Sequence, residues 1–324
     1  MSLFSVKKSE IKANVTYDEV KIILNDDIKW IDIIKPTKKS IDMLRDKFDF
    51  HELLLEDCLM ENQRSKLDDY DDYSFIILHL PRYKKESNRL VSEEVDIFIG
   101  TDYIVTLHEG ELKPLTIFSQ MCYANKDNRE KYMSQGSALL LYEIIKRLFD
   151  YCLPMIDKIG VMIDSINKSI FKDRSKYMLE NISTTKMQII NYRKVIKPLR
   201  PVILMLEKII KPYLPEDNEA YFDDITDKTE QIWNMLENYK EVIESLDDTF
   251  TSLTNHQANN LMRTFTIVQV ITLPMVLVGG LFSMNLEGIP LHAFASGFWI
   301  VFGMILIPTG LIASLLILNR KKWL

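Results

Sequence analysis

The strongest pattern along the chain is a pair of apolar runs close to its C-terminal end. The first run is TFTIVQVITLPMVLVGGLF at 264–282, and the second is FWIVFGMILIPTGLIASLLIL at 298–318. Neither run contains Asp, Glu, Lys or Arg, and each is close to the roughly 20 residues that an α-helix needs to cross a bilayer. Two such runs in succession favour two transmembrane helices over buried helices of a soluble protein.

Basic residues flank this pair of runs at its outer ends. Arg263 precedes the first run and NRKKWL follows the second, whereas the connecting segment 283–297 has no Lys or Arg. Because positively charged flanks stay in the cytoplasm, both termini are expected there and the connecting segment outside. The sequence thus predicts a multi-pass protein of the plasma (inner) membrane with a large cytoplasmic N-terminal part.

A regular apolar pattern leads into the first run. Nine positions follow the 4,3 spacing of a coiled-coil-like seam: Ile225, Thr229, Ile232, Leu236, Tyr239, Ile243, Leu246, Phe250 and Leu253. No proline interrupts this segment before Pro274, so we expect one helix over about 216–282. Acids dominate its first half, which indicates either a solvated helix face or a region that attracts divalent cations.

The rest of the chain changes from strand-like to helical patterns. Segments rich in Ile, Val and Tyr predict four strands, at 28–34, 73–80, 93–100 and 103–109, and helices are predicted at 37–48 and 51–60. After about 112 the strand signal stops, and two long helices are predicted at 134–170 and 176–211.

Together these patterns predict an α+β protein. In order, we expect a cytoplasmic α/β domain, a cytoplasmic helical hairpin, a stalk helix, a transmembrane helix, an outer loop, a second transmembrane helix and a basic cytoplasmic tail. Their expected bounds are 1–130, 131–215, 216–263, 264–282, 283–297, 298–318 and 319–324.

Charge and composition narrow the possible functions. The chain has 40 Lys and Arg against 46 Asp and Glu, a net charge of −6, which argues against nucleic acid as a partner. Its three cysteines form no CxxC pair, its five histidines are scattered, and no P-loop motif occurs. Because the sequence has no convergent catalytic constellation, we expect neither an enzyme nor an organic cofactor.

One face of the first apolar run carries polar residues. Met262, Phe265, Gln269, Leu273 and Val276 follow 3,4,4,3 spacing, and Asn259 and Gly280 flank them. Gln269 should face protein or water, since an amide in lipid is costly, and both helix–helix hydrogen bonding and pore lining satisfy this. Because two helices cannot enclose an aqueous path, a pore would require an oligomer.

With these features in place, the chain resembles the CorA superfamily of divalent-cation channels. The likeness rests on HELLLEDCL (51–59), QRSKLDDYDDYSFIIL (63–78), KPLRPV (197–202), YFDDITDKTEQI (221–232) and the terminal KKWL. It also rests on Ser283-Met284-Asn285, where the family has Gly-Met-Asn. The resemblance covers nearly the whole chain, and it implies a homopentamer in membrane lipid that carries Mg²⁺, with Co²⁺ or Ni²⁺ as further substrates.

The resemblance also implies roles for individual residues. Asn285 matches the signature Asn, whose ring binds hydrated Mg²⁺ at the outer mouth beside Ser283 and Met284. Asn259 matches a polar ring at the cytoplasmic end of the pore. The residues that line the pore between these rings are Met262, Phe265, Gln269, Leu273, Val276 and Gly280. Asp224, with Asp223 and Asp227 nearby, matches a stalk acid that helps to hold a regulatory Mg²⁺ between subunits.

Two positions depart from the family pattern. Ser283 replaces the signature Gly, and if that turn needs positive φ, Ser costs roughly 1–2 kcal/mol unless Gly279 and Gly280 supply the bend. Lys84 stands where an acid is expected to face Asp224 across the subunit boundary.

Two alternative functions remain open. The outer-loop sequence NLEGIP is similar to the zinc-transporting ZntB branch of the superfamily. A membrane-anchored scaffold or sensor would also have two spans and a stalk.

Overall fold

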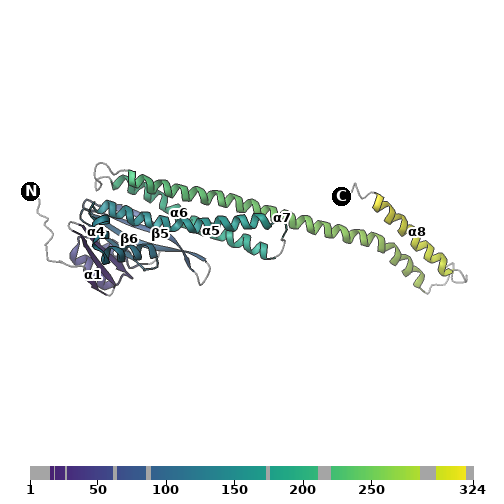
Figure 1. The fold of residues 1–324 in the computed structure, drawn as a ribbon. Coiled ribbons are helices and arrows are strands. Elements are labelled where there is room, and N and C mark those ends of the chain that lie inside the picture. Colours follow the sequence, from purple (N-terminus) through teal and green to yellow (C-terminus); the bar gives the residue numbers. More distant parts are fainter. Residues whose placement is uncertain are drawn as a thin grey trace, which may run out of the picture. The chain divides into compact units, whose positions relative to one another are not determined.

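The computed structural model describes residues 15–17, 19–25, 28–60, 64–84, 89–172, 176–210, 220–284 and 297–318. The chain divides into two compact units, Met1–Asp247 and Asp248–Leu324. The first unit holds a β-sheet, helices α1–α6 and the first part of α7 (Ala220–Ser283), as Figure 1 shows. The second unit holds the rest of α7 and α8 (Gly297–Leu318).

Seven strands form one sheet in the order β1-β2-β3-β7-β6-β5-β4. Their bounds are Val15–Tyr17 (β1), Val20–Asn25 (β2), Ile28–Ile34 (β3), Lys66–Asp69 (β4), Tyr73–Lys84 (β5), Arg89–Gly100 (β6) and Tyr103–His108 (β7). Strands β3 and β7 are parallel, and all other neighbouring pairs are antiparallel. The sheet is therefore mixed, and its longest pairing joins β5 to β6.

Two short helices, α1 (Lys38–Lys47) and α2 (Glu52–Asp57), pack on one face of the sheet. In the buried cluster beneath them, Phe50 stacks on Phe98 with 4.1 Å between ring centroids. Thr37 and Ser40 exchange hydrogen bonds in a capping box, which satisfies amide groups that the first turn of α1 would leave unpaired.

Further helices cover the opposite face of the sheet. They are α3 (Lys113–Ala124), α4 (Lys126–Met133), α5 (Ser137–Ser169) and α6 (Lys176–Ile209). Both α3 and α4 contact β2, whereas α5 and α6 contact strands in the other half of the sheet, from β7 to β4. Along β3, Ile31 and Ile33 point to the face that α1 and α2 cover, so Trp30 points to the opposite face. Its ring centroid lies 5.2 Å from that of Phe118 in α3.

The first part of α7 packs on α5 and α6 of the same chain. The predicted seam is largely buried here, with Ile225, Ile232 and Ile243 fully enclosed. Ion pairs border it: the guanidinium of Arg200 binds both carboxylate oxygens of Glu230 at 2.7 Å. The 4,3 spacing thus marks a face that its own chain covers.

A buried polar network joins the parallel strands β3 and β7. Asp32 Oδ1 accepts hydrogen bonds from Thr106 Oγ1 at 2.7 Å and from His108 Nε2 at 3.0 Å, and Trp30 Nε1 donates to Thr106 Oγ1. The Gly110 amide donates to His108 Nδ1, so the ring hydrogen lies on Nε2, toward Asp32. Burial alone would raise the pKa of Asp32, but the hydrogen bonds hold it below its usual value.

Most of the predicted elements are confirmed. The strand predicted at 28–34 is β3, and the helices predicted at 134–170, 176–211 and 216–282 are α5, α6 and α7. The sequence did not predict β1, β2, β4, α3 or α4. Strand β4 is the short polar segment KLDD, which β5 stabilises by pairing along its whole length, a contact that local sequence does not encode.

We predict that Asp32→Asn lowers the stability of the first unit by about 1–3 kcal/mol, because an amide cannot replace a buried charge-assisted acceptor. The lowered pKa of Asp32 makes this contribution present above the unfolded-state pKa of about 3.9 and lost as pH falls through the folded-state value. Thermal unfolding of the full-length protein should therefore show a gap between wild type and variant that narrows below about pH 4.

The matched control is Asp71→Asn, at an exposed position, which should change stability by less than about 0.5 kcal/mol. An equal effect of both substitutions would contradict the role of the buried network.

Candidate functional site

The second unit contains the apolar part of α7. Among the described residues, one helix is long and apolar enough to cross a membrane, Tyr221–Leu281, with a mean hydropathy of 1.9 in its most apolar stretch. This agrees with the first predicted span. A shorter apolar helix is found at Phe302–Leu311 within α8, so the second span stays a prediction.

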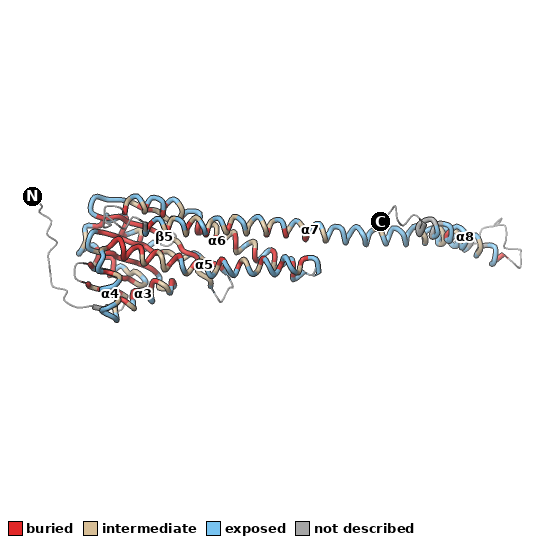
Figure 2. Tube along the Cα trace, turned by 45° about the horizontal axis from the view of Figure 1, so that its top comes forward, coloured by how far each residue is buried: buried red, intermediate tan, exposed pale blue. Residues whose placement is uncertain are grey.

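The predicted pore stripe lies on the continuous helix α7. Its large apolar members are all exposed in the single chain: Met262, Phe265, Leu273 and Val276. In Figure 2, the C-terminal part of α7 is pale blue over most of its length. Apolar side chains that are exposed in such number need lipid or another chain to cover them.

Gln269 stands out on this stripe. With Leu273 and Val276 it lines an open groove along α7. The nearby hydroxyl groups of Thr266 and Thr272 donate to backbone carbonyls one turn earlier, so both have a hydrogen-bond acceptor within α7. The Gln269 side-chain amide has no such partner in the part of the chain that the structure describes. It is therefore available to water, an ion's hydration shell or another chain.

Helix α7 ends at the predicted signature. Ser283 is its last residue, and the Met284 amide donates to the Leu281 carbonyl at 3.3 Å. Among the described residues, Lys35 is the only non-glycine residue with positive φ, so Ser283 carries no left-handed strain. Gly279 lies within α7 without positive φ. The expected cost of Ser at this turn is therefore absent.

Several other predicted positions of the outer loop lie outside the described residues. Among them is Asn285, the residue to which the sequence assigns the ion site. Asn259 and Gly280 lie at the two ends of the stripe on α7, and both are exposed.

The stalk acids differ in their surroundings. Asp223 and Asp227 are exposed, whereas Asp224 is held within its own chain. Asp224 Oδ2 accepts a hydrogen bond from the Tyr142 hydroxyl at 3.2 Å and pairs with Lys228 Nζ at 3.3 Å. Burial, and then the nearby Asp224 charge, raise the pKa of Tyr142 to about 12, so the phenol remains a donor.

Lys228 bridges two helices. Its ammonium group also lies 3.1 Å from Asp150 Oδ1 on α5, so one cation serves two carboxylates. Burial lowers the pKa of Lys228, but its bonds to Asp150 and Asp224 outweigh this and raise it. Sequence reasoning missed this bridge. Only its i,i+4 half, Asp224–Lys228, is visible as a spacing.

A metal ion at the stalk acids would need ligands beyond the carboxylates of one chain. Among the described residues, no three His, Cys, Asp or Glu side chains are arranged to hold a metal ion. A regulatory ion at Asp223, Asp224 or Asp227 would therefore require ligands from water or from a second copy of the chain. Lys84, the predicted opposite group, ends β5 and is exposed.

Comparisons with known proteins agree with this arrangement. A family model described as "CorA-like Mg2+ transporter protein" matches residues 25–321. The chain is 29% identical over 294 residues to the putative metal ion transporter YfjQ of Bacillus subtilis, covering 91% of this chain and 89% of that protein. It is 28% identical over 279 residues to the cobalt/magnesium transport protein CorA of Thermotoga maritima, covering 86% and 78%.

Solved structures share the fold. The complete CorA magnesium transporter from Methanocaldococcus jannaschii matches with a TM-score of 0.76 at 19% identity, over 93% of this chain and 98% of that one. The ZntB cytoplasmic domain from Vibrio parahaemolyticus matches with a TM-score of 0.54 at 14% identity, over 71% and 88%. Since both match, the fold of the cytoplasmic part does not separate CorA-like from ZntB-like proteins.

We predict that Lys228→Met makes the stability of the first unit depend on Mg²⁺. Without the ammonium group, the Asp150 and Asp224 carboxylates lose their shared cation, at a cost of about 1 kcal/mol for such partly exposed pairs. A divalent cation would offset the repulsion that results. The melting temperature of the variant should therefore rise with added Mg²⁺ more than that of the wild type.

The control for this prediction is Lys240→Met on the same helix. Lys240 pairs only loosely with Glu244, at 3.8 Å, and its loss should leave the Mg²⁺ response unchanged. If both variants respond alike, Lys228 does not act as the internal counter-ion.

Proposed function

This chain belongs to the family of CorA-like Mg²⁺ transporter proteins, and from that premise we propose that it conducts hydrated Mg²⁺ inward through an oligomeric pore lined by α7. Co²⁺ and Ni²⁺ are further substrates in this proposal. The observation that carries it is the row of exposed residues on one face of α7, with the unpartnered amide of Gln269 among apolar side chains.

Asn285 would make the first contact with the ion at the outer mouth. Mg²⁺ gives up its first-shell waters reluctantly, so a site for the hydrated ion must accept hydrogen bonds rather than replace water. Amide oxygens do this without a net charge. Carboxylates would hold the ion more tightly and slow its release, whereas conduction needs weak sites.

The lining of α7 suits passage without tight binding. Asn259 and Gln269 offer neutral polar groups, and apolar residues such as Phe265 and Leu273 separate them. A constriction of this kind can close by losing water and open by widening. Entry needs no nucleotide, because a divalent ion gains about 4.6 kcal/mol per 100 mV of membrane potential.

A homopentamer is the proposed assembly. One chain supplies a single stripe, so several copies around an axis are needed to enclose a path. The exposed stripe supports this proposal, because the single chain leaves it uncovered. In the proposed topology, both termini lie in the cytoplasm of a cell whose plasma membrane the chain crosses twice.

Gating by cytoplasmic Mg²⁺ is part of the proposal. Crowded carboxylates of neighbouring stalks would repel one another, and a bound divalent ion would join them. Because Lys228 already neutralises Asp224, the exposed Asp223 and Asp227 are the stronger candidates for this ion.

Mg²⁺ should protect the assembled wild-type protein from proteolysis at lower concentrations than those that protect an Asp223→Asn/Asp227→Asn variant. Identical protection curves would remove both residues from the sensor.

Two alternatives can be separated from this function by flux measurements. A ZntB-like zinc transporter would carry Zn²⁺ in preference to Mg²⁺, and a scaffold or sensor would carry neither. Purified protein in liposomes, tested with each ion with and without a pH gradient, distinguishes all three.

We predict that Asn285→Ala abolishes Mg²⁺ flux into liposomes while assembly, measured by size-exclusion chromatography, stays normal. The substitution removes the proposed acceptors for the hydration shell. Ser283→Gly is the control and should keep the wild-type rate, because the structure shows no strain at Ser283. Wild-type flux through a correctly assembled Asn285→Ala variant would end the role proposed for this residue.

We predict that Gln269→Cys forms disulfides between subunits in the assembled protein, because position 269 would face the axis. The three native cysteines are free and buried, so their background should be low. Ile305→Cys on α8 is the matched variant. Crosslinks through position 305 instead of position 269 would show that α8 faces the axis and that the assignment of the pore to α7 is wrong.

A further inference from the structure

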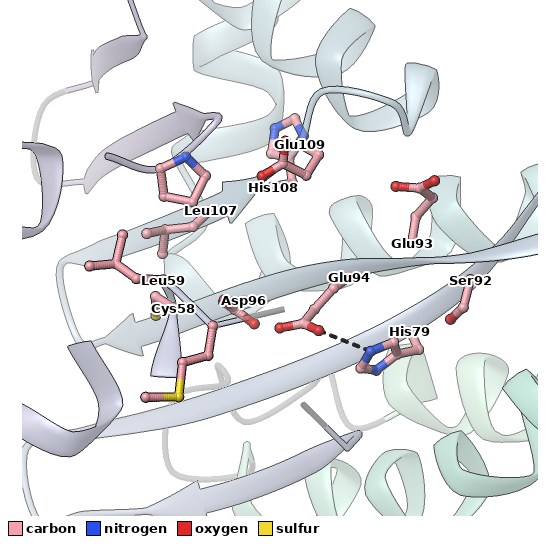
Figure 3. Close-up of a pocket in the computed structure, with 12 residues that line it drawn as sticks. Cys58, Leu59, His79, Ser92, Glu93, Glu94, Asp96, Leu107, His108 and Glu109 are labelled. Carbon is pink, nitrogen blue, oxygen red and sulfur yellow. Dashed lines mark ion pairs between the residues drawn. The ribbon is translucent and has the colours of Figure 1, made fainter. Parts of the chain in front are cut away.

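A pocket of about 360 Å³ lies in the first unit between α2, β5, β6 and the end of β7 (Figure 3). Of the titratable side chains that line it, four lie in a row: Cys58, His79, Glu94 and Asp96. None of them belongs to the proposed ion path or to the stalk acids.

The strand pairing explains how these groups meet. Glu94 and Asp96 lie two residues apart on β6, so both side chains point to the same face of the sheet. His79 is the cross-strand neighbour of Glu94, and its Nε2 lies 3.0 Å from Glu94 Oε2. Cys58, at the C-terminal end of α2, comes within hydrogen-bonding reach of Asp96. The row therefore connects α2 to β6 and β5.

Asp96 occupies a position where the strand pattern calls for an apolar residue. It is only 5% exposed, and its Oδ1 has no hydrogen-bond partner in the part of the chain that the structure describes. A buried carboxylate without full hydrogen bonding is costly unless a cation or a proton neutralises it. Burial, and then the charge of Glu94, raise the pKa of Asp96 well above its usual range.

The basic side chains of β4 and β5 beside this pocket are already engaged. Lys66 of β4 pairs with Asp57 and Asp68, His79 pairs with Glu94, and Arg82 pairs with Glu93. The titratable groups that face Asp96 or its pocket are Asp57 and Cys58 of α2, His79 of β5, Glu93 and Glu94 of β6, and His108 and Glu109. Within the described residues, a proton is therefore the neutralising charge that remains.

We propose that Glu94 and Asp96 form a proton-binding site that fastens α2 to the sheet. The proton lies on the buried Asp96 carboxyl group, beside Glu94. On release, the proton passes to water through the open side of the pocket and leaves a second negative charge beside Glu94. The Cys58 thiol, whose pKa burial and then the Asp96 charge raise, stays protonated and donates to Asp96. The new charge weakens the docking of α2.

The direction of the pH effect follows from linkage. The docked state binds the proton more tightly than the undocked state, so α2 is held most firmly at low pH. The equilibrium constant for undocking of α2 should rise by up to about tenfold per pH unit as pH rises toward the docked-state pKa. Above that pKa, the constant should level off. This effect does not depend on the proposed ion path.

Amide hydrogen exchange of the full-length protein in detergent, from pH 6 to pH 9 and corrected for intrinsic rates, tests this proposal. Protection of the α2 amides in the wild type should fall with pH and then level off, while α1 serves as the internal reference. In Asp96→Asn, which cannot titrate, the α2 protection should not change with pH. Glu94→Gln keeps Asp96 but removes the neighbouring charge, so its curve should level off at a lower pH.

Glu109→Gln is the matched control, because Glu109 lines the same pocket but is exposed. Its curve should match the wild type. A wild-type curve without pH dependence overturns the proposal, even if Asp96→Asn fails to fold. Equal pH dependence in wild type and Asp96→Asn, or no shift in Glu94→Gln, overturns it as well.

Discussion

The continuity of helix α7 is the constraint on which the rest of the structure depends. A helix satisfies its backbone hydrogen bonds internally, so the same segment can lie against protein in one part and face hydrocarbon in another. The side chains alone must then change with the surroundings. In Ala220–Ser283 they do so: a buried face with 4,3 spacing gives way to apolar side chains that the chain leaves exposed. The long helices α5 and α6 pack against the first of these two parts.

Sequence predicted those features that repeat along the chain. The long helices and the strand β3 show strong periodicity or an unbroken apolar run, so their type and approximate bounds could be read directly. The partner of a buried face could not be read this way. The spacing from Ile225 onward shows that one face is covered, and it suits a second chain as well as α5 and α6. Short strands such as β4 exist only because a neighbour pairs with them.

The candidate site also has parts that the sequence predicts and parts that it does not. Residues on one helix face, such as Phe265 and Gln269, share a stripe that spacing alone predicts. The surroundings of Asp224 depend on residues that are distant in sequence. Tyr142, which donates to Asp224, is 82 residues away, and Asp150 is 78 residues from Lys228, the cation that it shares with Asp224. These contacts change the chemistry of the stalk, because an ammonium group occupies a place between carboxylates that a metal ion could otherwise take.

Two buried carboxyl groups of the same sheet show how far partners decide the state of a residue. Asp32 and Asp96 are both almost fully enclosed, and burial pushes both pKa values upward. Asp32 faces hydrogen-bond donors, which reverse the shift, so its charge supports the fold at neutral pH. Asp96 faces another acid, which adds to the shift, so its neutral form supports the fold. The same residue type therefore stabilises β3 as an anion and β6 as an acid, and only the arrangement of neighbours across the sheet distinguishes the two.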